Sequence, residues 1–303
     1  MNKILPPDNY STRDPFVMKH NGLYYRCFTK DAASVWLSCS ATIDGLSCAE
    51  EVLVYTPEPG LEYSCHLWAP ELHVIENRCY IYVACDDGNT NHHRMYVLEN
   101  GSDNPMQPYT MHGKITDTAD KYAIDGTVLR HCGNLYFVWS GQAGDVSGQQ
   151  NLYIAKMDGP FALSSERVLL SVPEYEWEKR GGLGIPGKSY INEGPFAVTL
   201  EGRTYLTYSA AGSWCEDYCI ALLKLVGDDP LNPACWQKQD HPVFSGNELV
   251  KGAGHCSVLC DDDRIHVFFH AWDREETEII WRTVSMWHAE LKEKNGTLVM
   301  DEA

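Results

Sequence analysis

The segment YINEGPFAVTLEGRTYLTY, residues 190–208, decides the fold of this chain. It places an acidic residue, Glu193, at the start of a short apolar strand, which a tight turn at Glu201-Gly202 joins to an aromatic-rich strand. Alone, the segment predicts only a β-hairpin with a carboxylate at its entrance. Four further segments repeat the arrangement, and the prediction of the fold depends on this repeat.

Each repeat consists of a polar entrance residue, a short strand, a turn and a second strand. The entrance residues recur at intervals of roughly 60 residues, and they are Asp14, Glu71, Asp125, Glu193 and His255. Asn-Gly and Gly-Asn turns, as at Asn21-Gly22, are strong hairpin signals. Further strand-like segments fill the intervals, at 35–39, 94–98, 151–155 and 218–223. The pattern predicts an all-β, five-bladed β-propeller, with residues 1–303 as a single domain. A β-sandwich or two smaller β domains are the alternatives, but no Pro/Ser-rich linker marks a boundary.

Composition excludes several classes of partner. The net charge of −18 argues against nucleic acid and anionic membranes as partners. No run of 18 apolar residues exists, and residues 1–7 lack the apolar core of a signal peptide, so we expect no membrane span and no leader. The 12 cysteines are scattered singly, which suits reduced, buried thiols and a cytoplasmic protein better than a disulfide framework.

The entrance residues matter because the first strands of all propeller blades line the central channel and run in the same direction. The ring would bring four carboxylates and one imidazole to one end of the axis. Like charges at short range raise one another's pKa and destabilise a fold, so the ring indicates function. Two interpretations follow: a divalent cation such as calcium, or an acid and a base that flank a scissile glycosidic bond.

A sugar-binding site also needs aromatic rings and hydrogen-bonding groups around the carboxylates. The sequence offers candidates close to the entrances and late in the fifth repeat. These candidate substrate-binding residues are His66, Trp68, Trp139, Gln142, Trp214 and Arg282. Glu71 fits the ring but has no assigned catalytic role.

Together these segments resemble glycoside hydrolase family 43, over nearly the whole chain. The motifs that carry the resemblance are Arg13-Asp14-Pro15-Phe16, residues 66–71 (HLWAPE), Ile124-Asp125-Gly126-Thr127, Asn192-Glu193-Gly194-Pro195 and Gly252-Ala253-Gly254-His255. The resemblance implies Asp14 as general base, Glu193 as general acid, and Asp125 as the residue that orients the acid and tunes its pKa. It also implies inversion at the anomeric carbon and a place for His255 beside a metal or water in the channel.

Residues 149–155 and 242–244 resemble the branch of exo-acting α-L-arabinofuranosidases. The predicted function is therefore release of terminal L-arabinofuranose from arabinose-containing oligosaccharides. The alternatives are a β-xylosidase acting on xylose-containing oligosaccharides and a non-catalytic carbohydrate-binding propeller. No cofactor is expected for the chemistry, although the resemblance allows a structural calcium ion in the channel.

One motif is dismissed on structural grounds. Residues 182–189 (GLGIPGKS) match the phosphate-binding loop pattern, which requires a following helix to hold the phosphates. Gly194-Pro195 follows instead, and no helix continues through this pair. We expect residues 182–189 to form the loop that delivers Glu193 to the channel.

Overall fold

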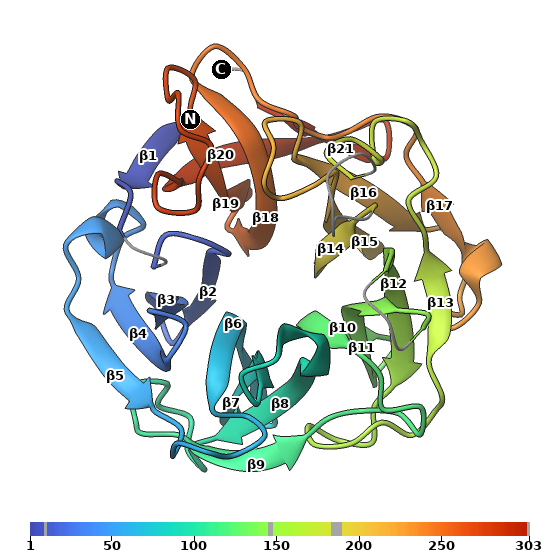
Figure 1. The fold of residues 1–303 in the computed structure, drawn as a ribbon. Coiled ribbons are helices and arrows are strands. Elements are labelled where there is room, and N and C mark those ends of the chain that lie inside the picture. Colours follow the sequence, from blue (N-terminus) through green and yellow to red (C-terminus); the bar gives the residue numbers. More distant parts are fainter. Residues whose placement is uncertain (9–10, 145–147, 183–189, 302–303) are drawn as a thin grey trace.

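Five antiparallel sheets stand around a common axis, and Figure 1 shows them as the blades of a ring. The computed structural model describes residues 1–8, 11–144, 148–182 and 190–301. The predicted five-bladed β-propeller is confirmed. In the described part of the chain, helical structure is limited to three short 3₁₀ turns, η1 (Asp44–Ser47), η2 (Thr90–His92) and η3 (Pro233–Cys235). No helix in that part is long and apolar enough to span a bilayer.

Each blade is a meander that starts at the channel and ends at the rim. Blades 1 to 3 are β2 (Phe16–His20), β3 (Leu23–Lys30), β4 (Ser34–Ser40), β5 (Glu51–Tyr55); β6 (Cys65–Ile75), β7 (Arg78–Asp86), β8 (Arg94–Glu99), β9 (Thr110–Lys114); and β10 (Ala123–His131), β11 (Asn134–Gln142), β12 (Gln150–Lys156), β13 (Val168–Ser171). Blades 4 and 5 are β14 (Asn192–Leu200), β15 (Arg203–Ala210), β16 (Cys219–Leu225), β17 (Trp236–Lys238); and β18 (Val250–Asp261), β19 (Arg264–Asp273), β20 (Ser285–Lys294), with β1 (Asn2–Leu5) and β21 (Thr297–Met300).

Two-residue turns join the first and second strands of the blades, as the sequence predicted. In blade 1, His20 pairs with Leu23 around Asn21-Gly22, whose φ angles are 49° and 79°. Blade 4 has the same geometry at Glu201-Gly202, with φ angles of 47° and 79°. Two successive positive φ angles are those of a type I′ turn, whose twist matches that of the flanking strands.

The ring closes through both ends of the chain. β1, from the N-terminus, pairs with β20 of blade 5, and β21, from the C-terminus, pairs with a later part of the same strand. Ile4 of β1 is buried beside Val17 of blade 1 and Phe268 of blade 5. Apolar contacts between the first and last blades therefore depend on the N-terminal strand.

A β-bulge opens the first strand of blades 2 to 5. In blade 3, pairing passes from Ile124 with Ser140 to Thr127 with Val138, so two residues oppose one. The first residue of each bulge has a left-handed φ: Ala69 (43°), Asp125 (56°), Gly194 (54°) and His255 (47°). Asp14, with φ 47°, occupies the same place before β2. The bulge turns the side chains at this position, and just before it, toward the mouth of the channel.

The sequence predicted that the five entrance residues occupy equivalent positions, and the observed strand pairing corrects this prediction for two of them. Asp14, Asp125 and His255 are equivalent, but Glu193 lies one residue before the bulge position and Glu71 lies two residues after it. The bulge inserts one unpaired residue into the strand. The alternation of polar and apolar side chains in the sequence does not show where this residue lies.

We predict that Ile4→Ala lowers the free energy of unfolding by about 2–4 kcal/mol, because it removes apolar contacts between the terminal blades. Urea denaturation followed by circular dichroism measures the change. The matched control is Lys3→Ala, which removes an exposed ion pair to Asp273 and should cost about 1 kcal/mol or less. Equal losses for the two variants would contradict the closing role of β1.

Candidate active site

A cavity of about 300 Å³ lies at the channel end where the five first strands begin. Residues at the bulge position or just before it form its floor: Arg13, Asp14, Trp68, Ile124, Asp125, Glu193 and His255. Strand ends, the turn η2 and loops around the mouth add further side chains, among them Thr90, Asn91, Gln142, Gln150, Ser213, Trp214 and Trp281. All five blades thus contribute to one site, which combines three carboxylates with tryptophan rings and amide groups.

Two histidines surround Asp14, and one of them, His255, holds its side chain as a carboxylate. The Nδ1 atom of His255 lies 3.1 Å from Oδ1 of Asp14, and Nδ1 of His270 lies 3.5 Å from the same oxygen. Burial raises the pKa of the Asp14 carboxyl, but the charge of His255 and its hydrogen bond to the carboxylate outweigh burial and hold the pKa well below its ordinary value. Asp14 is therefore ionised at neutral pH and can accept a proton.

The pKa of the Glu193 carboxyl is displaced in the opposite direction, above its ordinary value. Its side chain is buried, and burial followed by the charge of Asp125 raises the pKa of Glu193 to about 8. The hydroxyl of Tyr218 donates a hydrogen bond to Oε1 of Glu193 at 2.9 Å, which partly offsets that rise. A carboxyl with this pKa carries its proton at neutral pH, as a general acid must.

Asp125 lies between these two groups in chain order and fixes the backbone beside the acid. The backbone N–H of Gly194 donates to Oδ2 of Asp125 at 3.0 Å. Burial, partly offset by the charge of His255, raises the pKa of Asp125 to about 6. The contact joins blades 3 and 4 directly behind Glu193, so Asp125 both anchors the acid and influences its pKa.

His255 contacts the carboxylate of Asp14, and its protonation state bears on the predicted metal. Burial lowers the pKa of His255, but the carboxylates of Asp14 and Asp125 outweigh this effect and raise it to about 10. A histidine binds metal through a neutral imidazole nitrogen, and calcium prefers a shell of six to eight oxygens. Among the residues described, no group of three or more His, Cys, Asp or Glu side chains could hold a metal ion. His255 is paired with Asp14 in this structure, and a metal ion beside it stays a prediction.

Three of the predicted substrate-binding residues lie at the cavity. Trp68, Gln142 and Trp214 belong to its lining. The Trp68 ring stacks on His93, with 4.0 Å between centroids, and the indole N–H of Trp214 donates to the carbonyl of Gly181 at 2.7 Å. Neighbouring groups thus fix the orientation of both rings.

The other three predictions need correction. Trp139 is buried in the core between Phe137 and Tyr153 rather than at the cavity, because alternation along β11 turns it into the blade. Arg282 is exposed and does not line the cavity. His66 is not part of the lining; its side chain is 40% exposed beside Trp68, with 6.2 Å between ring centroids, and its Nδ1 is 2.9 Å from Oδ1 of the buried Asp86.

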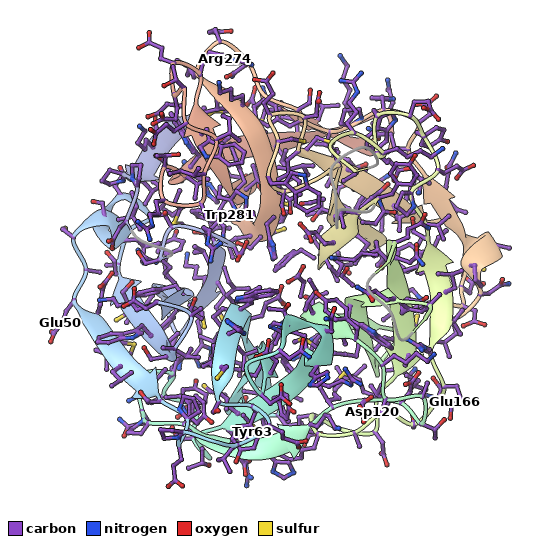
Figure 2. The ribbon with its side chains drawn as sticks, in the orientation of Figure 1. Glu50, Tyr63, Asp120, Glu166, Arg274 and Trp281 are labelled. Atoms are coloured by element: carbon purple, nitrogen blue, oxygen red, sulfur yellow. The ribbon has the colours of Figure 1, made fainter. Side chains whose placement is uncertain are left out.

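Several residues that line the cavity were not predicted from the sequence, among them Arg13 and Trp281. Arg13 precedes the base in the chain, and its guanidinium lies 4.8 Å from the ring centroid of Trp281. Figure 2 shows Trp281 toward the middle of the ring and Arg274 at the rim. The position of Arg13 beside Asp14 was the available signal; nothing in the sequence marked Trp281.

Two further expectations concern residues near the site. Glu71 does not line the cavity; it is buried along β6, with Oε2 at 2.8 Å from Nε2 of His73. The glycine-rich segment 182–189 was expected to deliver Glu193, and all of it except Gly182 lies outside the described residues. All 12 cysteines are free, as expected from their spacing.

Comparisons with known proteins agree with this geometry. The sequence model of "Glycosyl hydrolases family 43" matches residues 6–294. An "Extracellular exo-alpha-(1->5)-L-arabinofuranosidase" of Streptomyces chartreusis is 33% identical over 278 residues, which cover 88% of this chain and 81% of the relative. "Alpha-L-arabinofuranosidase 43" of Humicola insolens is 33% identical over 88% of this chain, which spans 55% of that relative's length.

A solved structure extends the likeness to three dimensions. The crystal structure of an alpha-L-arabinofuranosidase from Lactobacillus brevis superposes with a TM-score of 0.86 at 28% sequence identity, covering 99% of this chain and 96% of that chain.

We predict that the carboxyl of Glu193 titrates near pH 8 and that Asp125→Asn lowers this pKa, because a charge that favours the protonated acid is removed. NMR of protein labelled with ¹³C at glutamate carboxyl groups follows the titration, with Glu193→Gln identifying the resonance. Glu71→Gln, a buried carboxylate outside the cavity lining, is the control and should shift the titration less. A Glu193 pKa near the ordinary value for glutamate would contradict the assignment of the acid.

Proposed function

The chain belongs to glycosyl hydrolases family 43, and we propose that it releases terminal α-L-arabinofuranosyl residues from arabino-oligosaccharides with inversion. One observation carries this function: two carboxyls in one cavity with pKa values displaced in opposite directions. Asp14 is ionised and Glu193 is protonated at the same neutral pH. Glycoside hydrolysis by inversion needs this pair in these states.

The reaction follows from the two groups. Glu193 donates its proton to the glycosidic oxygen as the bond from that oxygen to the anomeric carbon breaks. Asp14 accepts a proton from a water molecule whose oxygen attacks the opposite face of the sugar. An inverting site leaves ~6.5–9.5 Å between the carboxyls for this water, and groups on different blades across a channel mouth can supply such a gap. The reaction leaves Asp14 protonated and Glu193 ionised, and exchange with solvent restores both.

The cavity suits a terminal sugar. Its volume of about 300 Å³ is at the small end of ligand pockets, so it holds a short substrate end rather than an extended chain. Trp68, Trp214 and Trp281 offer apolar faces to a sugar ring, and Asn91, Gln142 and Gln150 offer amide groups to its hydroxyls. A purely sugar-binding propeller would have no use for an acid and base in opposite protonation states.

We predict that the protein hydrolyses an aryl α-L-arabinofuranoside faster than an aryl β-D-xyloside. Glu193→Gln and Asp14→Asn should each lower kcat by roughly 10²–10⁴-fold, because general acid and base catalysis contribute about that much. Spectrophotometric release of the aryl group measures the rates. Arg282→Gln, an exposed residue outside the cavity lining, is the control and should leave them unchanged.

Three outcomes would contradict this function: faster hydrolysis of the xyloside, no turnover of either substrate, or wild-type rates in both carboxyl variants. NMR of the first product formed tests the stereochemistry in the same reaction. An α-linked substrate should give β-arabinofuranose first, and initial α-arabinofuranose would contradict inversion.

We also propose that the hydrolysis requires no metal ion, because the imidazole of His255 interacts with Asp14. Extensive dialysis against a chelator should leave kcat and KM unchanged. Activity that falls on dialysis and returns with calcium, but not with magnesium, would contradict the proposal. A change in Tm without a change in kcat would indicate an ion that stabilises the fold but takes no part in the reaction.

A further inference from the structure

Two buried rings lie between the base and the acid. His270 of β19 and Tyr218, which precedes β16, stack with 5.6 Å between ring centroids and 12° between planes. Neither side chain is exposed to solvent. Neither lines the cavity, so their role in the proposed reaction, on which this inference rests, is indirect.

The histidine contacts the base through the backbone. The N–H of Asp14 donates to Nδ1 of His270 at 3.1 Å, across 256 residues of chain. This hydrogen bond holds Asp14 in its left-handed conformation, with φ 47°, which few non-glycine residues adopt. It thereby fixes the direction in which the Asp14 side chain enters the cavity.

The tyrosine contacts the acid through its hydroxyl. Tyr218 donates to Oε1 of Glu193 at 2.9 Å, and this contact is buried on both sides. The tyrosine ring has room because residue 254 is glycine: a Cβ there would lie 2.1 Å from the ring. The ring of Trp281 also packs against His270, edge to face, with 6.0 Å between the ring centroids.

We propose that His270 and Tyr218 form a ring bridge, a positioning pair that sets the separation between Asp14 and Glu193. Its three links are the backbone bond at Asp14, the stacked rings and the hydroxyl bond at Glu193. Since inversion requires space for one water between the carboxyls, a fixed separation is a condition of the reaction. A displacement of about 1 Å in such a site can cost about 10²-fold in rate.

The test compares variants that keep or remove single links. The amide oxygen of His270→Asn can replace Nδ1 as the acceptor for the Asp14 N–H, whereas the longer side chain of His270→Gln cannot place it there. We expect His270→Gln to lower kcat by roughly 10²-fold with little change in KM, and His270→Asn to recover most of that loss. His266→Gln, at a buried histidine on the same strand whose Nδ1 lies 2.9 Å from Nε2 of His288, is the control.

Tyr218→Phe keeps the stacked ring and removes only the bond to the acid. Its loss of rate should therefore grow as the leaving group becomes more basic, from a dinitrophenyl arabinoside to an arabino-oligosaccharide, because only a poor leaving group needs full protonation. The control Tyr82→Phe, at a buried tyrosine outside the cavity lining, loses a partly buried hydrogen bond from its hydroxyl to the carbonyl of Pro160. Combining His270→Gln with Tyr218→Phe should cost less than the product of the single losses, as for residues that act as one unit.

Equal loss in His270→Asn and His270→Gln, or losses that multiply in the double variant, would overturn the ring bridge. Crystal structures of wild type and both His270 variants provide a readout independent of activity. The separation of the Asp14 and Glu193 carboxyls should be kept in His270→Asn and altered in His270→Gln. An inactive wild type would refute the proposed function alone, and an unchanged separation in His270→Gln would refute the ring bridge alone.

Discussion

The left-handed residue at the start of each blade's first strand, which belongs to a β-bulge in blades 2 to 5, is the constraint on which the site depends. In a regular strand, successive side chains alternate between the two faces of a blade, and few of them would face the mouth of the channel. The bulge, with its left-handed residue, breaks this alternation and turns two successive positions toward the cavity. Asp14, Asp125 and His255 occupy one of these positions, and Glu193 occupies the other. Blades 2 and 4, which place Ala69 and Gly194 at the bulge, present Trp68 and Glu193 one residue earlier instead.

The electrostatics of the cavity explain how the fold tolerates several acids in one place. Asp14 is paired with His255, so its charge is compensated within the site. Glu193, buried and close to Asp125, keeps its proton and adds no charge at neutral pH. Asp125 receives the backbone N–H of Gly194. The same burial and charges that would destabilise a ring of four carboxylates thus separate the base from the acid by pKa, as the proposed reaction requires.

Candidate residues could be predicted from the sequence where they belong to a repeated element, and much less well where they depend on loops. Trp68 lies just before a bulge, and its place in the lining follows from the repeat. Trp139 was expected at the cavity because it lies at the end of the third repeat's inner hairpin, but strand alternation turns it into the core. Arg282 was predicted to bind substrate only because it is positively charged. The arginine that lines the cavity is Arg13 instead. The conformation of the loop around Trp281 has no signature in residue order.

By itself, the sequence determined the propeller, the number of its blades and the three acids, because hairpin turns and alternating strands are local and repeat along the chain. Only the tertiary structure decided the register of Glu193 and Glu71, since a bulge adds one unpaired residue whose position depends on the neighbouring strand. It also decided the closure by β1 and the stacking of His270 on Tyr218, which join residues far apart in the chain. The glutamate at residue 193 was visible as an acid in a hairpin; its proton depends on burial and on Asp125, 68 positions earlier in the chain.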